Sequence, residues 1–170
     1  TALSIPYFNL AKAYMSLGQY TKAVAAYEKA LDNLTNNPPE SHNRAGVMAD
    51  FKIHLAEAQY LAGDKDAINI LVKAVEELDA SDEKKVSSYN YGVWKSGAFM
   101  AAARILKDDD PGKAKDFLEL AKNIIDSDQT LKIRKTQWEK LAKTFQIVFV
   151  ATATMTAYYL PRILLAKVVA

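Results

Sequence analysis

The sequence of 170 residues contains no cysteine, which excludes disulfide bonds and thiolate metal sites and leaves stability to packing. Its two histidines, His42 and His54, do not stand at a metal-ligand spacing. The chain also lacks a glycine-rich phosphate loop, a nucleophile elbow and a carboxylate pair beside a base. The aspartates at 108–110 lack the alternating ligand spacing and the distal glutamate of a calcium loop. We therefore expect a protein that is not an enzyme and needs no cofactor or metal.

Glycine and proline are scarce, with six and five residues. These are the residues that most often interrupt helices, and the remaining sequence is rich in Ala, Leu, Lys and Glu, so we predict an all-α fold. A first antiparallel helix pair is expected over 6–17 and 21–34. The first helices of a second and a third pair are expected over 41–62 and 81–106, the latter with a possible interruption at 89–92.

Three positions have the chemistry of helix ends. Pro6 is suited to a first helical position, and Gly18 is suited to end the first helix in a left-handed conformation. Asp110 is expected to cap the helix that Pro111 begins. These signals place two of the turns that separate paired helices.

The first pair alternates large and small residues around a turn glycine. Small residues let two helices approach closely, and aromatic rings fill the remaining space. This pattern resembles the tetratricopeptide repeat. The residues in register with that family are Tyr7, Leu10, Ala11, Tyr14, Gly18, Tyr20, Ala23, Tyr27, Ala30 and Leu31. Thr35 stands where the family usually has proline, but Pro38 and Pro39 follow closely enough to stop the helix.

Two further helix pairs repeat the pattern more loosely. The second carries it at Leu55, Ala56, Gly63, Ala67, Leu71 and Ala74, and the third at Ala101, Ala102, Ala114, Leu118 and Ala121. The turn glycines Gly18 and Gly63 are 45 residues apart, whereas the typical repeat has about 34 residues. We assign the extra length to longer first helices. The resemblance implies a tetratricopeptide-like α-solenoid of about three pairs over residues 1–128.

In this family the first helices of successive pairs line a concave groove that holds a peptide or a partner helix. The resemblance therefore implies that partner-binding residues lie on these helices. By register they are Phe8, Asn9, Lys12, Ile53, His54, Glu57, Phe99 and Met100, with Ile5 and Ala103 beside them. Lys12 and Glu57 are the polar members expected to face the groove. The alternative for each apolar member is that it packs between neighbouring repeats.

The resemblance does not extend to the carboxylate clamp by which some members hold a chaperone's C-terminus. That clamp needs polar and basic residues at set positions of three repeats. The matching positions hold Phe8, Lys12, His54, Ser96 and Met100. A chaperone-docking role is therefore not expected.

The net charge of +2 is unevenly distributed. Residues 1–130 carry 15 basic and 19 acidic groups, net −4, whereas residues 131–170 carry 7 basic groups and 1 acidic group, net +6. An acidic body does not favour nucleic-acid binding. The positive charge belongs to a second region, residues 129–170.

This second region is expected to begin as a basic cap helix. Leu131, Arg134, Trp138, Leu141 and Ala142 fall on one face of it, directed at the last repeat, with the arginine along the edge. Repeat arrays need such a helix to cover their last apolar face.

The uncharged run from Thr144 to Pro161 follows, 18 residues that would extend roughly 27 Å as a helix. This length predicts a membrane-spanning helix over about 144–165. The residues expected at the two membrane interfaces are Trp138, Lys140, Lys143, Tyr158, Tyr159 and Arg162. The alternatives are a buried helix packed against a partner, a membrane-surface helix, and a strand, which the β-branched residues of 147–156 would suit.

These features predict a non-enzymatic protein–protein interaction scaffold that is anchored at a membrane and holds or assembles partners of a membrane complex. Lipid would be contacted by the C-terminal helix, and neither nucleic acid nor a small-molecule substrate is expected. Basic residues before the span predict that the repeats lie on the cytosolic, stromal or matrix side. The order of a repeat domain followed by a C-terminal span is similar to that of tail-anchored repeat adaptors of organelle membranes, so an organelle membrane is expected. The alternatives are a permanent accessory subunit of a respiratory or photosynthetic complex, and a soluble adaptor with a buried cap helix.

Overall fold

The computed structural model describes residues 3–38 and 44–145, and within these ranges the chain is all helical. The labelled helices are α1 (Ser4–Ser16), α2 (Tyr20–Asn36), α3 (Arg44–Leu61), α4 (Ala67–Asp79), α5 (Glu83–Val86), α6 (Ser88–Leu106) and α7 (Pro111–Ser127). A further helix occupies residues 132–145 and is called here the final helix. The all-α prediction is confirmed for the described residues.

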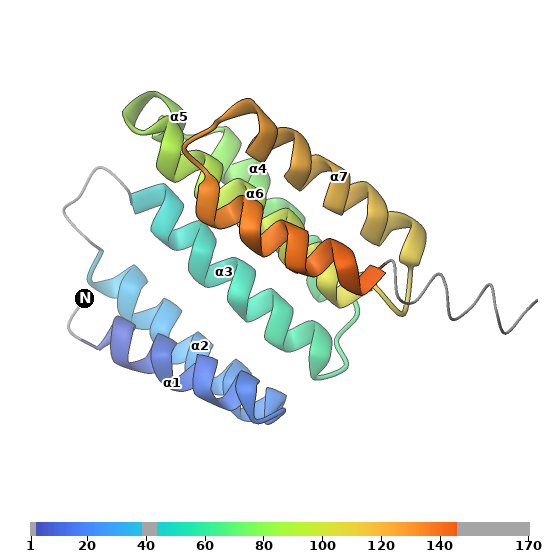
Figure 1. Cartoon of the computed structure of the whole chain (residues 1–170). Coiled ribbons are helices and arrows are strands. Elements are labelled where there is room, and N and C mark those ends of the chain that lie inside the picture. Colours follow the sequence, from blue (N-terminus) through green and yellow to red (C-terminus); the bar gives the residue numbers. More distant parts are fainter. Residues whose placement is uncertain (1–2, 39–43, 146–170) are drawn as a thin grey trace, which may run out of the picture.

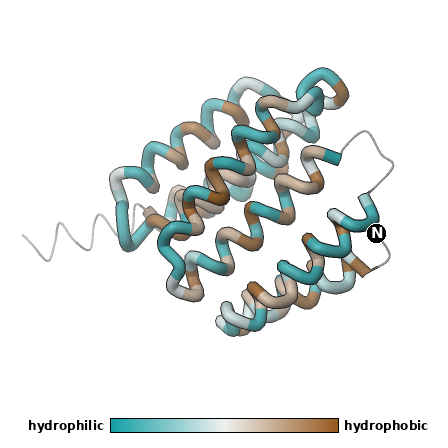
Figure 2. The backbone as a smooth tube through the Cα atoms, turned by 180° about the vertical axis from the view of Figure 1, so that it is seen from behind, coloured by the Kyte–Doolittle hydropathy of each residue, from teal (hydrophilic) through white to brown (hydrophobic). Residues whose placement is uncertain are grey.

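The helices pack in the order expected of a helical-repeat array. Helices α1 and α2 form one pair, α3 and α4 a second, and α6 and α7 a third, and α3 lies between the first pair and α6 (Figure 1). Hydrophobic and hydrophilic segments alternate along the helices (Figure 2). Helices such as α2 and α4 bury one face, whereas α3 is buried on two sides.

Two of the three predicted end signals are confirmed, whereas Pro6 is the third residue of α1 and not its first. Gly18 adopts a positive φ of 67° after α1, a conformation that costs glycine little because it has no Cβ. Asp110 Oδ1 accepts a hydrogen bond from the backbone N–H of Lys113 at 3.0 Å, and Pro111 begins α7. Both turns therefore form through the local chemistry that the sequence provides.

Two hydrophobic clusters fill the spaces between helices. The first joins α1, α2 and one side of α3, where Phe8, Tyr27 and Phe51 are buried. The second joins α3, α4, α6 and α7 around residues such as Leu71 and Leu78, neither of which is exposed to solvent. Helix α3 contributes buried residues to both clusters.

The third pair begins with an interruption, but the predicted position of 89–92 is wrong. The break lies at Ser87, which is extended with φ −154° and ψ 99° between α5 and α6. Its Oγ accepts a hydrogen bond from the N–H of Asn90 at 3.2 Å. Ser87 thus caps α6, whereas Tyr89–Gly92 lies inside that helix.

The start of α3 is fixed by contacts with α5 and α6. The N–H of Gly46 donates to Oε1 of the buried Glu83 at 3.2 Å. The Trp94 ring lies so close to Gly46 that a Cβ at this position would be 1.9 Å from Cζ3 of the ring. Glycine is therefore required here for a close approach between helices.

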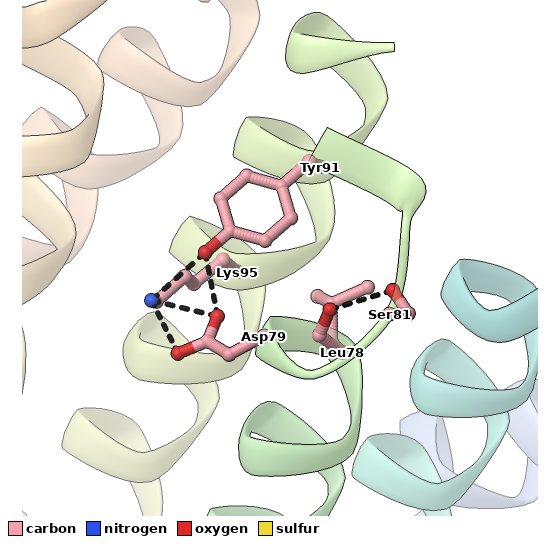
Figure 3. Close-up of polar contacts among 5 residues, drawn as sticks. All are labelled: Leu78, Asp79, Ser81, Tyr91 and Lys95. Carbon is pink, nitrogen blue, oxygen red and sulfur yellow. Dashed lines mark hydrogen bonds and ion pairs between the residues drawn. The ribbon is translucent and has the colours of Figure 1, made fainter. Parts of the chain in front are cut away.

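The end of α4 is joined to α6 by a polar network (Figure 3). Lys95 Nζ donates to Asp79 at 2.7 and 2.8 Å, and the Tyr91 hydroxyl lies 2.5 Å from Asp79 Oδ1. Burial is the main cause of the raised pKa of Tyr91, and the hydrogen bond to Asp79 acts in the same direction. Nearby, Ser81 Oγ donates to the carbonyl of Leu78 at 2.7 Å. These bonds fix the connection between the second and third pairs.

The final helix packs on the third pair through the face predicted for a cap. Leu131 and Phe145 are buried, and Trp138, Leu141 and Ala142 pack against the second cluster. The indole N–H of Trp138 donates to the carbonyl of Leu118 in α7 at 2.8 Å. The expected cap contacts are therefore present.

Within residues 3–38 and 44–145, no helix is both long and apolar enough to cross a membrane. The span predicted over about 144–165 lies outside the described residues except for its first two positions. Tyr158, Tyr159 and Arg162, which were predicted for the membrane interface, also lie outside the described residues.

Candidate partner-binding groove

Helices α3, α6 and the final helix surround a pocket of about 320 Å³, called here the central groove. In Figure 1 the final helix (orange) runs beside α3. The lining residues are Asp50, Ile53 and His54 of α3, Gly97, Ala98, Met100, Ala101 and Arg104 of α6, and Arg134, Gln137, Lys140 and Leu141 of the final helix. Both apolar and charged side chains therefore line this pocket.

Small residues of α6 form the floor of the central groove and leave space above the helix backbone. Ala98 and Ala101 are buried, and Gly97 faces the Arg134 guanidinium. A Cβ on Gly97 would lie only 3.0 Å from Arg134 Nη2. The absence of a side chain at this position lets the guanidinium rest on the α6 backbone.

A buried carboxylate and an arginine join the two walls formed by α3 and α6. Arg104 Nε and Nη2 each lie 2.7 Å from Oε1 of Glu57, which is only 5% exposed. Burial acts to raise the Glu57 pKa, but interactions with His54 and Arg104 outweigh it, so the pKa of Glu57 lies below its usual value. Glu57 is therefore ionised and compensated at neutral pH.

His54 connects the central groove to the first helix pair. Its ring stacks with Tyr27 at a centroid distance of 5.9 Å and meets Phe8 edge-on at 5.2 Å. Its Nε2 lies 3.8 Å from Asp50 Oδ1, and its Nδ1 lies 3.6 Å from Glu57 Oε2. The imidazole thus stands between an aromatic cluster and two carboxylates.

Arg134 is a partly buried cation on the groove wall. Its Nη1 donates to Oε1 of the neutral Gln137 at 2.8 Å. Desolvation lowers the pKa of Arg134, while the charge of Asp50 acts in the opposite direction. Among the described residues no carboxylate lies within ion-pair distance of this guanidinium.

The central groove includes some of the residues predicted to bind a partner. Ile53, His54 and Met100 line it, but Ile53 and Met100 are buried and only His54 is partly exposed. Lys140 also lines it, although the sequence placed this lysine at a membrane interface. The partner-binding role of these side chains stays a prediction.

The other predicted groove residues lie elsewhere. Phe8 is buried against Phe51 with a centroid distance of 4.3 Å, because this position packs between the pairs. Lys12 lies with Nζ 5.9 Å from the Phe8 ring, outside the pocket lining, and Asn9 is exposed on α1. These three positions belong to the first pair and do not reach the central groove.

Three further expectations need correction. Glu57 does not face the groove freely, because it is buried in its ion pair with Arg104. Phe99 packs against Phe117 of α7 at 5.9 Å, since its position points to the other side of α6. Lys143 is exposed, whereas Trp138, predicted for the membrane interface, is half-buried against α7.

Four polar residues that line the central groove were not among the partner-binding residues predicted from the sequence: Asp50, Arg104, Arg134 and Gln137. Two of them stand on the helices expected to form the groove, so their register could have indicated them. The other two lie on the final helix, which was expected only to cap the array. Its position beside α3 and α6 depends on contacts distant in sequence.

One comparison with known proteins identifies part of this architecture. The family model of the tetratricopeptide repeat matches residues 5–33. No curated protein and no solved structure matches the chain. The matched segment coincides with α1, the Gly18 turn and most of α2. Residues 5–33 are therefore similar to a tetratricopeptide repeat.

Proposed function

We propose that this protein is a non-enzymatic scaffold that binds a segment of a partner protein in the central groove. The observation that carries the proposal is the position of this pocket on the first helices of the second and third pairs. Tetratricopeptide repeats commonly present that face to their ligands. The partly exposed Leu141, next to charged groups such as Lys140, suits an amphipathic segment of another chain.

A site-specific photocrosslink tests this part of the proposal. A photoreactive amino acid would replace Gln137, which is exposed and lines the central groove. The matched control would carry it at Leu120, which is 45% exposed on α7 and does not line the groove. A discrete crosslinked partner from position 137 but not from position 120 is expected. Equal crosslinking at both positions would contradict a groove-based scaffold.

We further propose that residues of about 144–165 anchor this scaffold in a membrane. The support is the 18-residue uncharged run after a basic segment. The repeats would then lie on the cytosolic, stromal or matrix side, beside a membrane complex whose components they hold or assemble. The charge bias of residues 132–143 supports this orientation.

Alkaline carbonate extraction of native membranes tests the anchor. Retention in the pellet is expected for the full chain, and release is expected for a variant that ends at Phe145. A native gel of the detergent extract then distinguishes two hypotheses. A permanent subunit would comigrate with one large complex, whereas a reversible adaptor would not. Release of the full chain would instead favour a soluble adaptor, for which the packed final helix is the supporting observation.

A further inference from the structure

Arg134 is partly buried, and no carboxylate of residues 3–38 and 44–145 lies within ion-pair distance of it. Its guanidinium rests on Gly97 of α6 and donates to Gln137. A partly buried cation has lost part of its hydration, and an uncharged amide replaces only a fraction of that stabilisation. This arginine is therefore able to form a stronger bond than any it makes within the described residues.

Two carboxylates of α3 lie at or near the central groove, and neither is within ion-pair distance of Arg134. Glu57 is bound by Arg104. Asp50 lies 3.8 Å from His54 and acts on Arg134 only at longer range. Lys140, on the same helix and lining the same pocket, also has no carboxylate within ion-pair distance among the described residues.

The groove therefore presents basic groups on two walls. Arg134 and Lys140 lie on the final helix, and Arg104 lies on α6 with its side chain 50% exposed beyond the Glu57 contact. One terminal carboxylate would occupy only one of these positions. Several acidic side chains spaced along a peptide would match all of them.

We propose that the central groove binds an acidic, amphipathic peptide segment of the partner, with an Asp or Glu side chain paired to Arg134 and another to Lys140. The inference rests on the proposed scaffold function and specifies its ligand chemistry. Arginine and carboxylate form two parallel charge-assisted hydrogen bonds when their planes align. The partly exposed Leu141 would contact the leucine or isoleucine side chains of the same peptide, above a floor formed by the buried Ile53 and Met100.

Peptide binding to the full chain tests this ligand chemistry. The probe is a fluorescent 14-residue helical peptide of alternating Glu and Leu pairs, acetylated and amidated, and its matched control has Gln at every Glu position. Saturable binding of the acidic probe that weakens with added salt is expected, with little binding of the Gln peptide. Equal binding of both peptides would overturn the proposal. Tighter binding of an acidic probe with a free C-terminus would overturn the choice of side-chain carboxylates.

Variants of the protein identify the residue responsible. Arg134→Gln is expected to weaken binding of the acidic probe about tenfold or more, as for loss of a hydrogen bond between charged groups. Lys73→Gln removes the same charge from an exposed position on α4 outside the groove and is expected to leave binding unchanged. Equal losses in the two variants would show non-specific attraction and overturn the site.

A charge reversal keeps the test valid even if Arg134→Gln perturbs folding. Arg134→Glu is expected to lose the acidic probe and to bind a probe with Lys at one Glu position, and the absence of this rescue would overturn the pairing. The crosslink from position 137 separates the two proposals. If the wild type gives the crosslink from position 137 but does not bind the acidic probe, the scaffold stands and its ligand chemistry is wrong. If the wild type gives no crosslink from position 137, the scaffold itself is contradicted.

Discussion

The guanidinium of Arg104 in α6 donates from Nε and Nη2 to the buried Glu57 carboxylate in α3, both at 2.7 Å. This pair bridges the second and third helix pairs beneath the central groove. Its two members have unequal exposure, because Arg104 is half-exposed whereas Glu57 is 7% exposed at its side chain. Loss of either partner therefore has different consequences.

Removal of the cation should destabilise the fold. In Arg104→Met, the Glu57 carboxylate stays buried without its main partner, and a loss of about 1–3 kcal/mol in the free energy of unfolding is expected. The double variant Glu57→Gln with Arg104→Met should lose less than the sum of the single changes. Urea denaturation of the four proteins measures this coupling, and strict additivity would show that the pair contributes nothing.

Stability should fall in acid because of Glu57. Its pKa is lowered in the folded protein from the ordinary value of 4.5. The contribution is therefore fully present above pH 4.5 and is lost as the pH falls toward the folded pKa. Unfolding free energies measured between neutral and acidic pH should decline more steeply for the wild type than for Glu57→Gln. Parallel profiles would contradict an ionised, compensated Glu57.

The stability of the protein should fall at alkaline pH because of Tyr60. Burial, together with the hydrogen bond from its hydroxyl to Asp109 Oδ2 at 2.7 Å, raises the pKa of Tyr60 to about 12. Stability from this group is therefore present below the ordinary value of 10 and lost as the pH rises toward about 12. Tyr60→Phe should cost about 0.5–1.5 kcal/mol at neutral pH and should flatten this alkaline decline. Stability against pH by circular dichroism measures both effects.

Gly46 should not tolerate alanine. A Cβ there would meet the Trp94 ring at 1.9 Å, and overpacking of this kind typically costs about 1–3 kcal/mol. The control is Gly112→Ala, where the nearest atom would be 3.5 Å away, an ordinary contact. Thermal unfolding should show a clear loss for the first variant only. Addition of Trp94→Leu to Gly46→Ala should recover part of the stability, and no recovery would mean that the cost arises elsewhere.

The sequence predicted the helical class and the first pair because their determinants are local. The alternation around Gly18 specifies both the turn and the close packing of α1 on α2. The break at Ser87 was missed because its cap signal lies between apolar residues that continue the helical pattern. The role of Arg134 was not predictable, because it depends on Gly97, 37 positions earlier, becoming its neighbour in space.

Helix α3 has buried residues on opposite sides, with Phe51 and Leu55 in one cluster and Ile53 and Tyr60 in the other. Separation of α1 and α2 from the remaining helices would expose one whole side of α3 to water. The two clusters should therefore melt together in one cooperative transition instead of unravelling repeat by repeat. A substitution that loosens either cluster would then lower the stability of both.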